Sequence, residues 1–266
     1  MKKKILAIVM SIVLVCGVVC AFTACGNDTK LVVAEAGSAG ESVMNENEYF
    51  ADFDKTPVDT QAKALMEVSA GTADMAVIDY VMSIGSIGEG TDFENLVLLE
   101  DASFAPEEYG IAFRKGSDTV NYVNAAIKEL KANGELENIA KTYKLQDLLL
   151  ADADYEEVTA EESDWAYIQE KGVLVVGITY FAPMNYKDED GKLVGFETEF
   201  AEAVAEELGL EVEFQVIDWN SKETELASKN IDCIWNGMTI TPERAENMQI
   251  SIPYMQNKQA VVVKAD

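Results

Sequence analysis

Residues 191–219, GKLVGFETEFAEAVAEELGLEVEFQVIDW, carry the clearest structural signal in the chain. Every fourth residue in the first part is apolar: Phe196, Phe200, Val204 and Leu208. This spacing predicts a helix over Phe196–Leu208, opened by Gly195, with one apolar face toward a core and its Glu residues toward water. The residues that follow predict a strand over Val212–Ile217. A helix followed closely by a strand is typical of α/β proteins.

The same alternation of strands and helices occurs in both halves of the chain. In the second half it predicts further strands at Leu174–Ile178 and Ile231–Ile234 and a helix at Lys222–Ala227. In the first half it predicts strands at Leu31–Ala34 and Met75–Ile78, a turn at Gly37–Gly40 leading into a helix, and a helix at Gln61–Ala70. Alternating strands and helices indicate parallel or mixed sheets covered by helices. We therefore expect an α/β fold with two similar lobes.

A helical section and a linker join these halves. Apolar residues at a spacing of three or four predict a helix around Val120–Leu130, which Gly134 ends, and a second helix over Glu135–Tyr143. Residues 148–163, LLLADADYEEVTAEES, are acidic and poor in turn signals. They predict a partly extended linker.

The N-terminus has the features of an export leader. Lys2–Lys4 give a basic start, and Ile5–Val19 give an apolar stretch too short to be treated as a spanning helix of the mature protein. Phe22–Cys25 resembles the lipobox of bacterial lipoproteins, although Phe22 stands where Leu is usual. We expect residues 1–25 to be a lipoprotein signal peptide, with Cys25 acylated as the membrane anchor. An ordinary signal peptide cleaved nearby is the alternative.

Composition excludes several classes of function. The formal charge is −28 and the chain has no histidine, which argues against nucleic acid and against His-based catalysis or metal binding. No calcium-loop or phosphate-loop motif appears, so neither a metal nor a cofactor is expected. Loss of the leader leaves Cys25 and Cys233 as the cysteines, so no disulfide framework is expected. Cys233 lies in an apolar run and is predicted to be a buried core residue.

Two segments of the second half resemble a known family. Residues 191–219 and residues 230–248, NIDCIWNGMTITPERAENM, resemble the first lobe of the polar amino-acid substrate-binding proteins of ABC transporters, which have the type II periplasmic-binding fold. In the first half, VVAEAGSAGES (32–42), GTADMAVID (71–79) and EEYGIAFRKGS (107–117) resemble the family's second lobe, its ligand-contacting strand end and its return hinge. The resemblance implies two lobes that close on an amino acid.

The order of the two lobes departs from the family and resembles a circular permutation. Residues 120–143 resemble the family's C-terminal helix, and they lead through the linker into DWAYIQEKGVLVVGIT (164–179), which resembles its usual mature start. The new ends, Lys30 and Asp266, are expected to lie close together, and one covalent hinge near Tyr109–Arg114 is expected to remain. A scrambled or spliced sequence is the alternative.

This interpretation divides the chain into five parts. They are the signal peptide (1–25), lobe two (30–111), a hinge return with helices that pack on lobe one (112–147), the acidic linker (148–163) and lobe one, which binds the ligand carboxylate (164–266).

The resemblance places the carboxylate site around Arg244. A guanidinium can bind a carboxylate with two parallel hydrogen bonds. Thr239 and the backbone around Asn236 and Gly237 correspond to groups that complete this site, with backbone N–H groups as further donors. A surface ion pair between Arg244 and a nearby Glu is the alternative that the spacing alone would favour.

The ammonium site is expected at Asp79, which ends a strand. Ligands of open α/β sheets bind at the carboxyl ends of strands. The alternative role for Asp79 is to cap the next helix, and both roles could coexist. On the same lobe, Ser38 and Ala39 match a turn that adds carboxylate contacts.

Aromatic residues and one acid are expected to line the side-chain pocket. Phe181 aligns with the family's stacking aromatic residue and Trp219 with a second apolar wall, whereas Trp235 fits a core position equally well. The turn that carries Phe181 is one residue shorter than in the family and lacks its acidic residue. Glu35 falls where the family contacts the ligand side chain, and an acid between aromatic faces favours a basic amino acid. A salt bridge from Glu35 to a lysine of the opposite lobe is the alternative.

We therefore expect an exported, membrane-anchored lipoprotein that captures a free amino acid, basic or polar, and delivers it to the permease of an ABC importer. No catalytic residue is expected, because binding needs no chemistry on the ligand. Two alternatives stay open: a catalytic relative of the same fold, such as a dehydratase or lyase with Glu35 as its acid or base, and an amino-acid sensor module.

Overall fold

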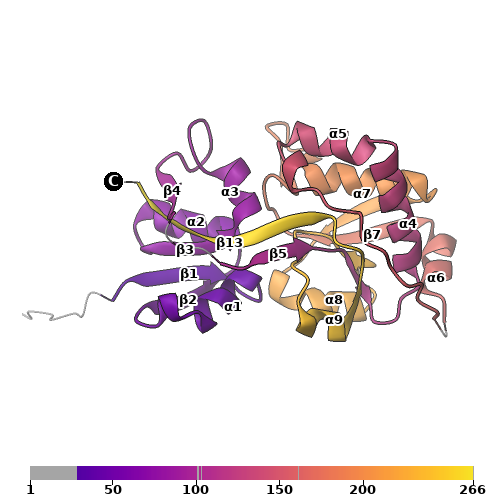
Figure 1. The fold of residues 1–266 in the computed structure, drawn as a ribbon, viewed down its shortest axis with the longest axis horizontal. Coiled ribbons are helices and arrows are strands. Elements are labelled where there is room, and N and C mark those ends of the chain that lie inside the picture. Colours follow the sequence, from indigo (N-terminus) through magenta and orange to yellow (C-terminus); the bar gives the residue numbers. More distant parts are fainter. Residues whose placement is uncertain (1–28, 101, 103, 161, 266) are drawn as a thin grey trace, which may run out of the picture.

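Two sheets, each covered by helices on both faces, form two lobes of the molecule (Figure 1). The computed structural model describes residues 29–100, 102, 104–160 and 162–265. The expected leader, Cys25 and Asp266 lie outside the described residues. Within the described part, no helix has the length and apolar character needed to cross a membrane. The predicted α/β fold with two lobes is confirmed.

Lobe two contains the sheet β2-β1-β3-β13-β4, to which β5 is added along β13. Its strands are β1 (Leu31–Glu35), β2 (Asp54–Val58), β3 (Met75–Asp79), β4 (Leu96–Leu98), β5 (Pro106–Tyr109) and β13 (Met255–Lys264), and its helices are α1 (Ala39–Glu46), the 3₁₀ turn Glu48–Phe50, α2 (Gln61–Ala70) and α3 (Tyr80–Ser86). Val32 and Ala34 pack in one core cluster with Met44 of α1, and Val33 packs in another with Leu65 of α2. Because both faces of β1 are buried, its sequence is a continuous apolar run.

Lobe one contains the sheet β10-β7-β11-β6-β12. Its strands are β6 (Ala112–Arg114), β7 (Val173–Ile178), β10 (Glu211–Val216), β11 (Cys233–Ile234) and β12 (Met248–Ile250), with a small hairpin β8 (Tyr186–Lys187) and β9 (Leu193–Val194); its helices are α4 (Thr119–Ala132), α5 (Glu135–Thr142), the 3₁₀ turns Gln146–Leu148 and Trp219–Ser221, α6 (Asp164–Lys171), α7 (Phe196–Glu207), α8 (Lys222–Ala227) and α9 (Pro242–Asn247). Strands β10, β7 and β11 are parallel. Cys233 is a free, fully buried thiol, as predicted.

Two strands, rather than the one expected, run between the lobes. The chain leaves lobe two through β5 and enters lobe one at β6; it returns through residues 251–254 into β13 (Figure 1). The two crossings pair antiparallel, with Met255 opposite Tyr109 and Lys258 opposite Pro106. The expectation that residues 164–266 form one lobe is therefore corrected, because β13 is long enough to pair with β5 and then with β3 of lobe two.

The described ends of the chain lie at the same edge of lobe two. Val32 and Val263 are both paired with Met75, one from each side of β3. They are therefore two strand spacings, about 10 Å, apart. In Figure 1 the C-terminal end, near β4, and the start of β1 lie at the same end of lobe two. This agrees with the expected proximity of Lys30 and the C-terminus, as far as residue 265 allows.

The acidic linker is extended and packs against the crossing strand that returns to lobe two and against α4. Leu150 N–H donates to Tyr254 O (2.9 Å) and Ala151 N–H donates to Pro253 O (3.0 Å). Asn121 of α4 exchanges two hydrogen bonds with the backbone of Val158.

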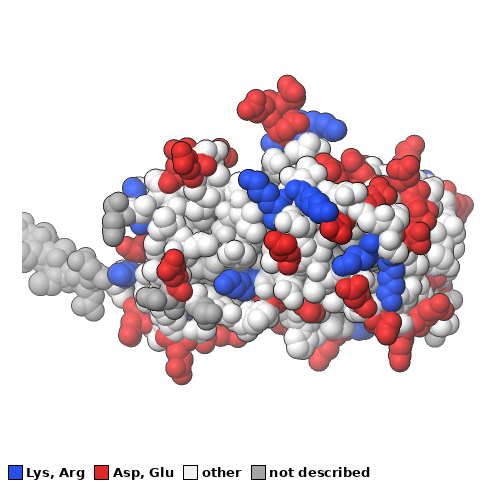
Figure 2. Space-filling model, turned by 45° about the horizontal axis from the view of Figure 1, so that its top comes forward, with Lys and Arg blue, Asp and Glu red and all other residues white. Residues whose placement is uncertain are grey.

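Acidic side chains are spread over the face of the molecule in Figure 2, with basic side chains between them. The acidic side chains on this face are therefore in contact with solvent.

Candidate functional site

A small cavity lies where the two lobes meet. It is lined by Glu35, Ser38, Ala39, Gln61, Asp79, Trp219, Asn236, Gly237, Thr239 and Arg244. Nine of these ten residues are predicted site residues, so the structure brings together groups that are far apart in the sequence. The free volume is about 10 Å³, close to the minimum that holds one water molecule. An amino acid can therefore enter only if the lobes separate.

Asp79 lies at the carboxyl end of β3 and is 6% exposed. It occupies the N-cap position of α3, yet its side chain makes no capping hydrogen bond. Its carboxylate instead accepts from the amides of Gln61, Asn257 and Gln259. Burial, followed by the nearby Glu107 carboxylate, raises the pKa of Asp79 to about 6. Of the two expected roles, its side-chain contacts favour the cavity over the cap.

Arg244 lies in α9 and is 8% exposed. Its guanidinium donates to Thr239 O (2.8 Å) and, across the lobes, to Gly37 O (3.1 Å). Burial lowers the pKa of Arg244. The ion pairs of the described residues include neither Arg244 nor Asp79. The cavity thus has a buried cation on lobe one and a buried carboxylate on lobe two, neither of them in an ion pair.

Glu35, at the end of β1, is 3% exposed, and its Oε1 atom has no hydrogen-bond partner among the described residues. Burial and the neighbouring Asp79 carboxylate raise the pKa of Glu35 to about 8. Lys222 lies on the opposite lobe and attracts Glu35 electrostatically, but the two form no direct ion pair in the described structure. The expected alternative, a salt bridge to a lysine of the other lobe, is therefore not formed.

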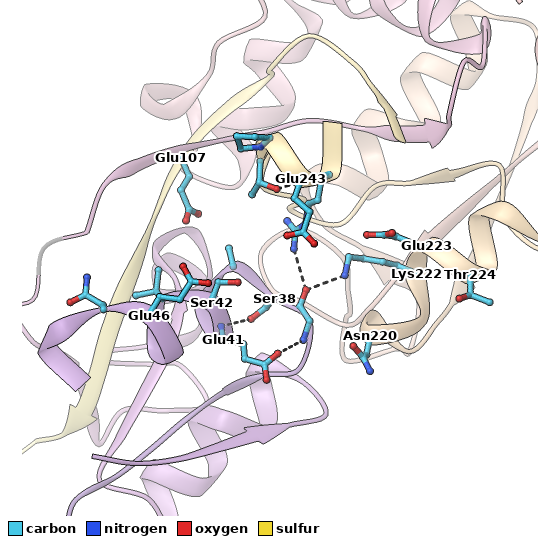
Figure 3. Close-up of a pocket in the computed structure, with 17 residues that line it drawn as sticks. Ser38, Glu41, Ser42, Glu46, Glu107, Asn220, Lys222, Glu223, Thr224 and Glu243 are labelled. Carbon is cyan, nitrogen blue, oxygen red and sulfur yellow. Dashed lines mark hydrogen bonds between the residues drawn. The ribbon is translucent and has the colours of Figure 1, made fainter. Parts of the chain in front are cut away.

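Lys222 is a second cation that joins the lobes. Its ammonium donates to Gly37 O (3.0 Å) and to Trp219 O (3.2 Å) and lies 4.8 Å from the centre of the Trp219 ring. Burial and the nearby Arg244 lower the pKa of Lys222 to about 8. Lys222 and Arg244 thus donate to the same carbonyl oxygen. In Figure 3 two dashed lines meet at this oxygen, one of them from Lys222.

The segment 236–239 forms the wall of the cavity on lobe one. The Asn236 side chain is held by Thr179, and the Thr239 hydroxyl donates to Glu107 (3.1 Å). The Gly237 N–H was expected to complete a carboxylate site, but it donates to the buried Glu197 behind the wall. Gly237 therefore shapes the cavity and does not offer a free donor to it.

The aromatic residues divide between the cavity and the core. Trp219 lines the cavity. Phe181 lies behind the wall in the core cluster, where a Cβ at Gly237 would come within 2.4 Å of its ring. Trp235 is fully buried against Phe200. Ser38 caps α1 by accepting from Glu41 N–H, and Ala39 begins that helix at the cavity.

A larger open cleft leads to the cavity between α1, α8 and α9. It has a volume of about 920 Å³ and shares Ser38, Ala39 and Arg244 with the cavity. Figure 3 shows the carboxylates that line it; these are Glu41, Glu46, Glu107, Glu223 and Glu243. The cleft provides the route by which a small molecule would reach the buried charges.

Sequence reasoning missed four polar residues around Asp79 and Arg244: Gln61, Lys222, Asn257 and Gln259. One signal could have found two of them. Asn257 and Gln259 alternate along β13 and so face one side of the sheet, and on that side both lie between apolar residues, at the start of a strand whose later part is a continuous apolar run.

Comparisons with known proteins agree with the resemblance. Residues 174–266 match the model of bacterial extracellular solute-binding proteins, family 3. The resemblance is confirmed over this segment. The L-cystine-binding protein TcyJ of Escherichia coli (strain K12) is 37% identical over 109 residues, which are 40% of this chain and 41% of the relative. The arginine-binding extracellular protein ArtP of Bacillus subtilis (strain 168) is 39% identical over 97 residues, 36% of this chain and 38% of the relative.

The chain therefore spans about two fifths of the length of the curated relatives that it matches. Among solved structures, an ABC uptake transporter substrate-binding protein from Streptococcus pneumoniae with bound histidine is 40% identical over 32% of this chain and 35% of that chain, with a TM-score of 0.31. The two curated relatives are named as binding proteins, one of L-cystine and one of arginine.

Proposed function

We propose that this protein is an extracytoplasmic solute-binding protein that holds a free amino acid between its lobes. The observation that carries the proposal is the arrangement of Arg244 and Asp79, two buried groups of opposite charge that line one cavity without ion-pair partners among the described residues. A buried charge without a partner is costly. The α-carboxylate and α-ammonium of an amino acid would supply both missing partners at once.

The raised pKa of Asp79 supports this assignment. An ammonium group next to Asp79 would favour the ionised carboxylate, which burial and Glu107 now disfavour. Arg244 would gain a charge-assisted hydrogen bond to the α-carboxylate in place of its present bond to the Gly37 carbonyl. Binding therefore exchanges neutral partners for charged ones.

Glu35 favours a ligand whose side chain carries a hydrogen-bond donor or a positive charge. Its Oε1 atom lacks a partner, and it lines the cavity together with Trp219. A polar side chain would satisfy this oxygen, and a cationic one would also favour the ionised Glu35 carboxylate, which burial and Asp79 now disfavour. Relatives named for L-cystine and arginine fit such a ligand.

Closure of the lobes would hold the ligand, and transport would follow from release. We propose delivery to the permease of an ABC importer, export through residues 1–25 and anchoring through acylated Cys25. The family match of residues 174–266 supports an extracellular location, and a relative named as a probable amino-acid ABC transporter-binding protein supports an ABC transporter as partner. The proposal includes no chemistry on the ligand, so no catalytic residue is assigned.

We also propose that the order of the lobes is circularly permuted. The support is the resemblance of residues 32–42, 71–79 and 107–117 to the family's second lobe, ahead of a segment that matches its model. The positions of Val32 and Val263 on either side of Met75 are those that a former connection would need.

A thermal-shift panel of free amino acids, on protein without residues 1–25, tests the function. Ligand at a hundred times its Kd should add roughly 2.7 kcal/mol of stability. Truncation of one partner of a buried charge pair costs about 2–5 kcal/mol, so Arg244→Ala should abolish the shift. Arg244→Lys should recover it in part, because an ammonium cannot bind a carboxylate through a planar fork.

Glu246→Gln, on the exposed side of the same helix, is the matched control and should leave the shift unchanged. Free amines and free carboxylic acids of the same side chain should fail, because each supplies one charge of the two. If no amino acid stabilises the protein, or if Arg244→Ala leaves a positive result unchanged, the assignment is wrong.

A further inference from the structure

Glu197 is a buried carboxylate outside the cavity and outside every role assigned above. It lies at the second position of α7 and is 1% exposed. Its oxygens accept from Gly237 N–H (2.9 and 3.0 Å) and from the Asn185 side-chain amide (2.9 Å), and they also accept from the Tyr254 hydroxyl.

These three donors belong to three different parts of lobe one. Gly237 is in the cavity wall. Asn185 ends the turn after β7, where its carbonyl accepts from Phe181 N–H (2.7 Å). Tyr254 precedes β13, and its N–H donates to Tyr109 O (3.0 Å) of the other crossing strand. One carboxylate therefore joins the wall of the site to both strands that connect the lobes.

The residues around these contacts are tightly packed. Gly237 has a φ of +57°, and a Cβ there would come within 2.4 Å of Phe181 Cε1. Thr198 fixes Asn185 by donating to its side-chain oxygen (3.0 Å). If Glu197 ceased to accept, the Gly237 N–H and the Tyr254 hydroxyl would be buried donors without a partner, and the wall or the crossing strand would have to move.

We propose that Glu197 is a positioning residue, which sets the geometry of the cavity wall relative to the crossing strands and thereby the affinity for ligand. The affinity part of this inference rests on the proposed function; the positioning part does not. Glu197 does not touch the cavity and so would act through Gly237 and Tyr254.

The charged and titratable groups that face Glu197 are few. Tyr254, Tyr109 and Asp79 interact with it, and burial outweighs the hydrogen bonds from Tyr254, Gly237 and Asn185, so the pKa of Glu197 rises to about 7. Protonation near neutral pH would place a hydroxyl donor among three existing donors. The wall should therefore respond to pH in a range where ordinary carboxylates do not titrate.

The experiment follows the backbone amide of Gly237 by NMR in ligand-free protein between pH 5 and pH 9. In the wild type, the Gly237 chemical shift should titrate with a midpoint near 7, and in Glu197→Gln this titration step should disappear. In Tyr254→Phe the midpoint should be higher, because the substitution removes a hydrogen-bond donor that favours the ionised Glu197. Glu202→Gln, on the exposed face of the same helix, should titrate like the wild type. Persistence of the step in Glu197→Gln, or no step at all, would overturn the proposal.

Ligand affinity gives the second readout, using the amino acid identified by the thermal panel. At pH 8 the Kd of Glu197→Gln should be at least about tenfold higher than that of the wild type, as expected for loss of a charged hydrogen bond. The ratio of the two Kd values should fall toward 1 at pH 6, where Glu197 of the wild type is itself protonated. A ratio that does not change with pH would mean that Glu197 is merely structural. Failure of every amino acid to bind would refute the proposed function while the Gly237 titration still tested the positioning.

Discussion

At the scale of one residue, the buried carboxylate of Asp79 is expected to lower the stability of the ligand-free protein. Its carboxylate is buried, accepts three side-chain hydrogen bonds, and still has its pKa raised to about 6 from an ordinary 3.8. Between about pH 4 and pH 6, Asp79 is therefore protonated in the folded state and ionised in the unfolded chain. Because the unfolded state then binds fewer protons, the contribution of Asp79 to the free energy of unfolding falls as pH rises through this range.

Asp79→Asn should consequently stabilise the ligand-free protein. The gain should be near zero at pH 4 and reach roughly 2–3 kcal/mol above pH 7, because each unit of pKa shift corresponds to about 1.4 kcal/mol. The same variant should lose the thermal shift with any amino acid. Urea denaturation at pH 4, 6 and 8 measures the first effect, with the exposed Asp92→Asn as control. Equal stability of Asp79→Asn and wild type at pH 8 would mean that Asp79 carries no uncompensated charge.

At the scale of elements, the start of α7 depends on a glycine. Gly195 has a φ of +132°, and a Cβ there would lie 2.1 Å from Met184 O. The helix that follows carries the apolar face of lobe one and, at its second position, Glu197. Gly191 also has a positive φ, of +79°, but a Cβ there would meet nothing within 4 Å.

These two glycines form a matched pair for substitution. Gly191→Ala should cost about 1–2 kcal/mol, the conformational penalty of a left-handed residue. Gly195→Ala should cost more than about 3 kcal/mol or prevent folding, because the added atom collides with backbone. Urea denaturation followed by circular dichroism compares them. Similar losses for both variants would show that the approach to Met184 O is not limiting.

At the scale of the whole molecule, the described ends lie together on lobe two, whereas the linker between α5 and α6 has Thr159 and Glu162 exposed and Ala160 half-buried. A protein tolerates new ends where few contacts cross. On either side of these residues the chain is held by hydrogen bonds: Val158 pairs with Asn121, and Ser163 caps α6.

A reordered chain tests the permutation directly. It would begin at Glu162, run to Lys264, continue through a joint of about four Gly and Ser residues into Lys30, and end at Thr159. Such a joint reaches about 13 Å, more than the roughly 10 Å between neighbours of β3 on either side. We expect the same ligand preference and closely similar affinity, measured by calorimetry against the original order. A reordered chain that fails to fold would argue that the original order is not a rearrangement of lobes.

Many helices and strands of this fold could be predicted from the local spacing of apolar residues. The helix predicted over Phe196–Leu208 is observed over Phe196–Glu207, and the one predicted over Gln61–Ala70 is observed with those bounds. Apolar spacing sets such elements because each must bury one face. Strands β1 and β3 could be predicted from continuous apolar runs, because both of their faces are buried.

The sequence by itself therefore determined the α/β class, most helices and strands, and nine of the ten residues that line the cavity. Only the tertiary structure decided that β13 crosses to lobe two, that Lys222 and Arg244 share the Gly37 carbonyl, and that the Gly237 N–H faces Glu197. The reason is physical: periodicity records which face of an element is buried, whereas the partner of a buried polar group is set by packing between segments distant in the chain.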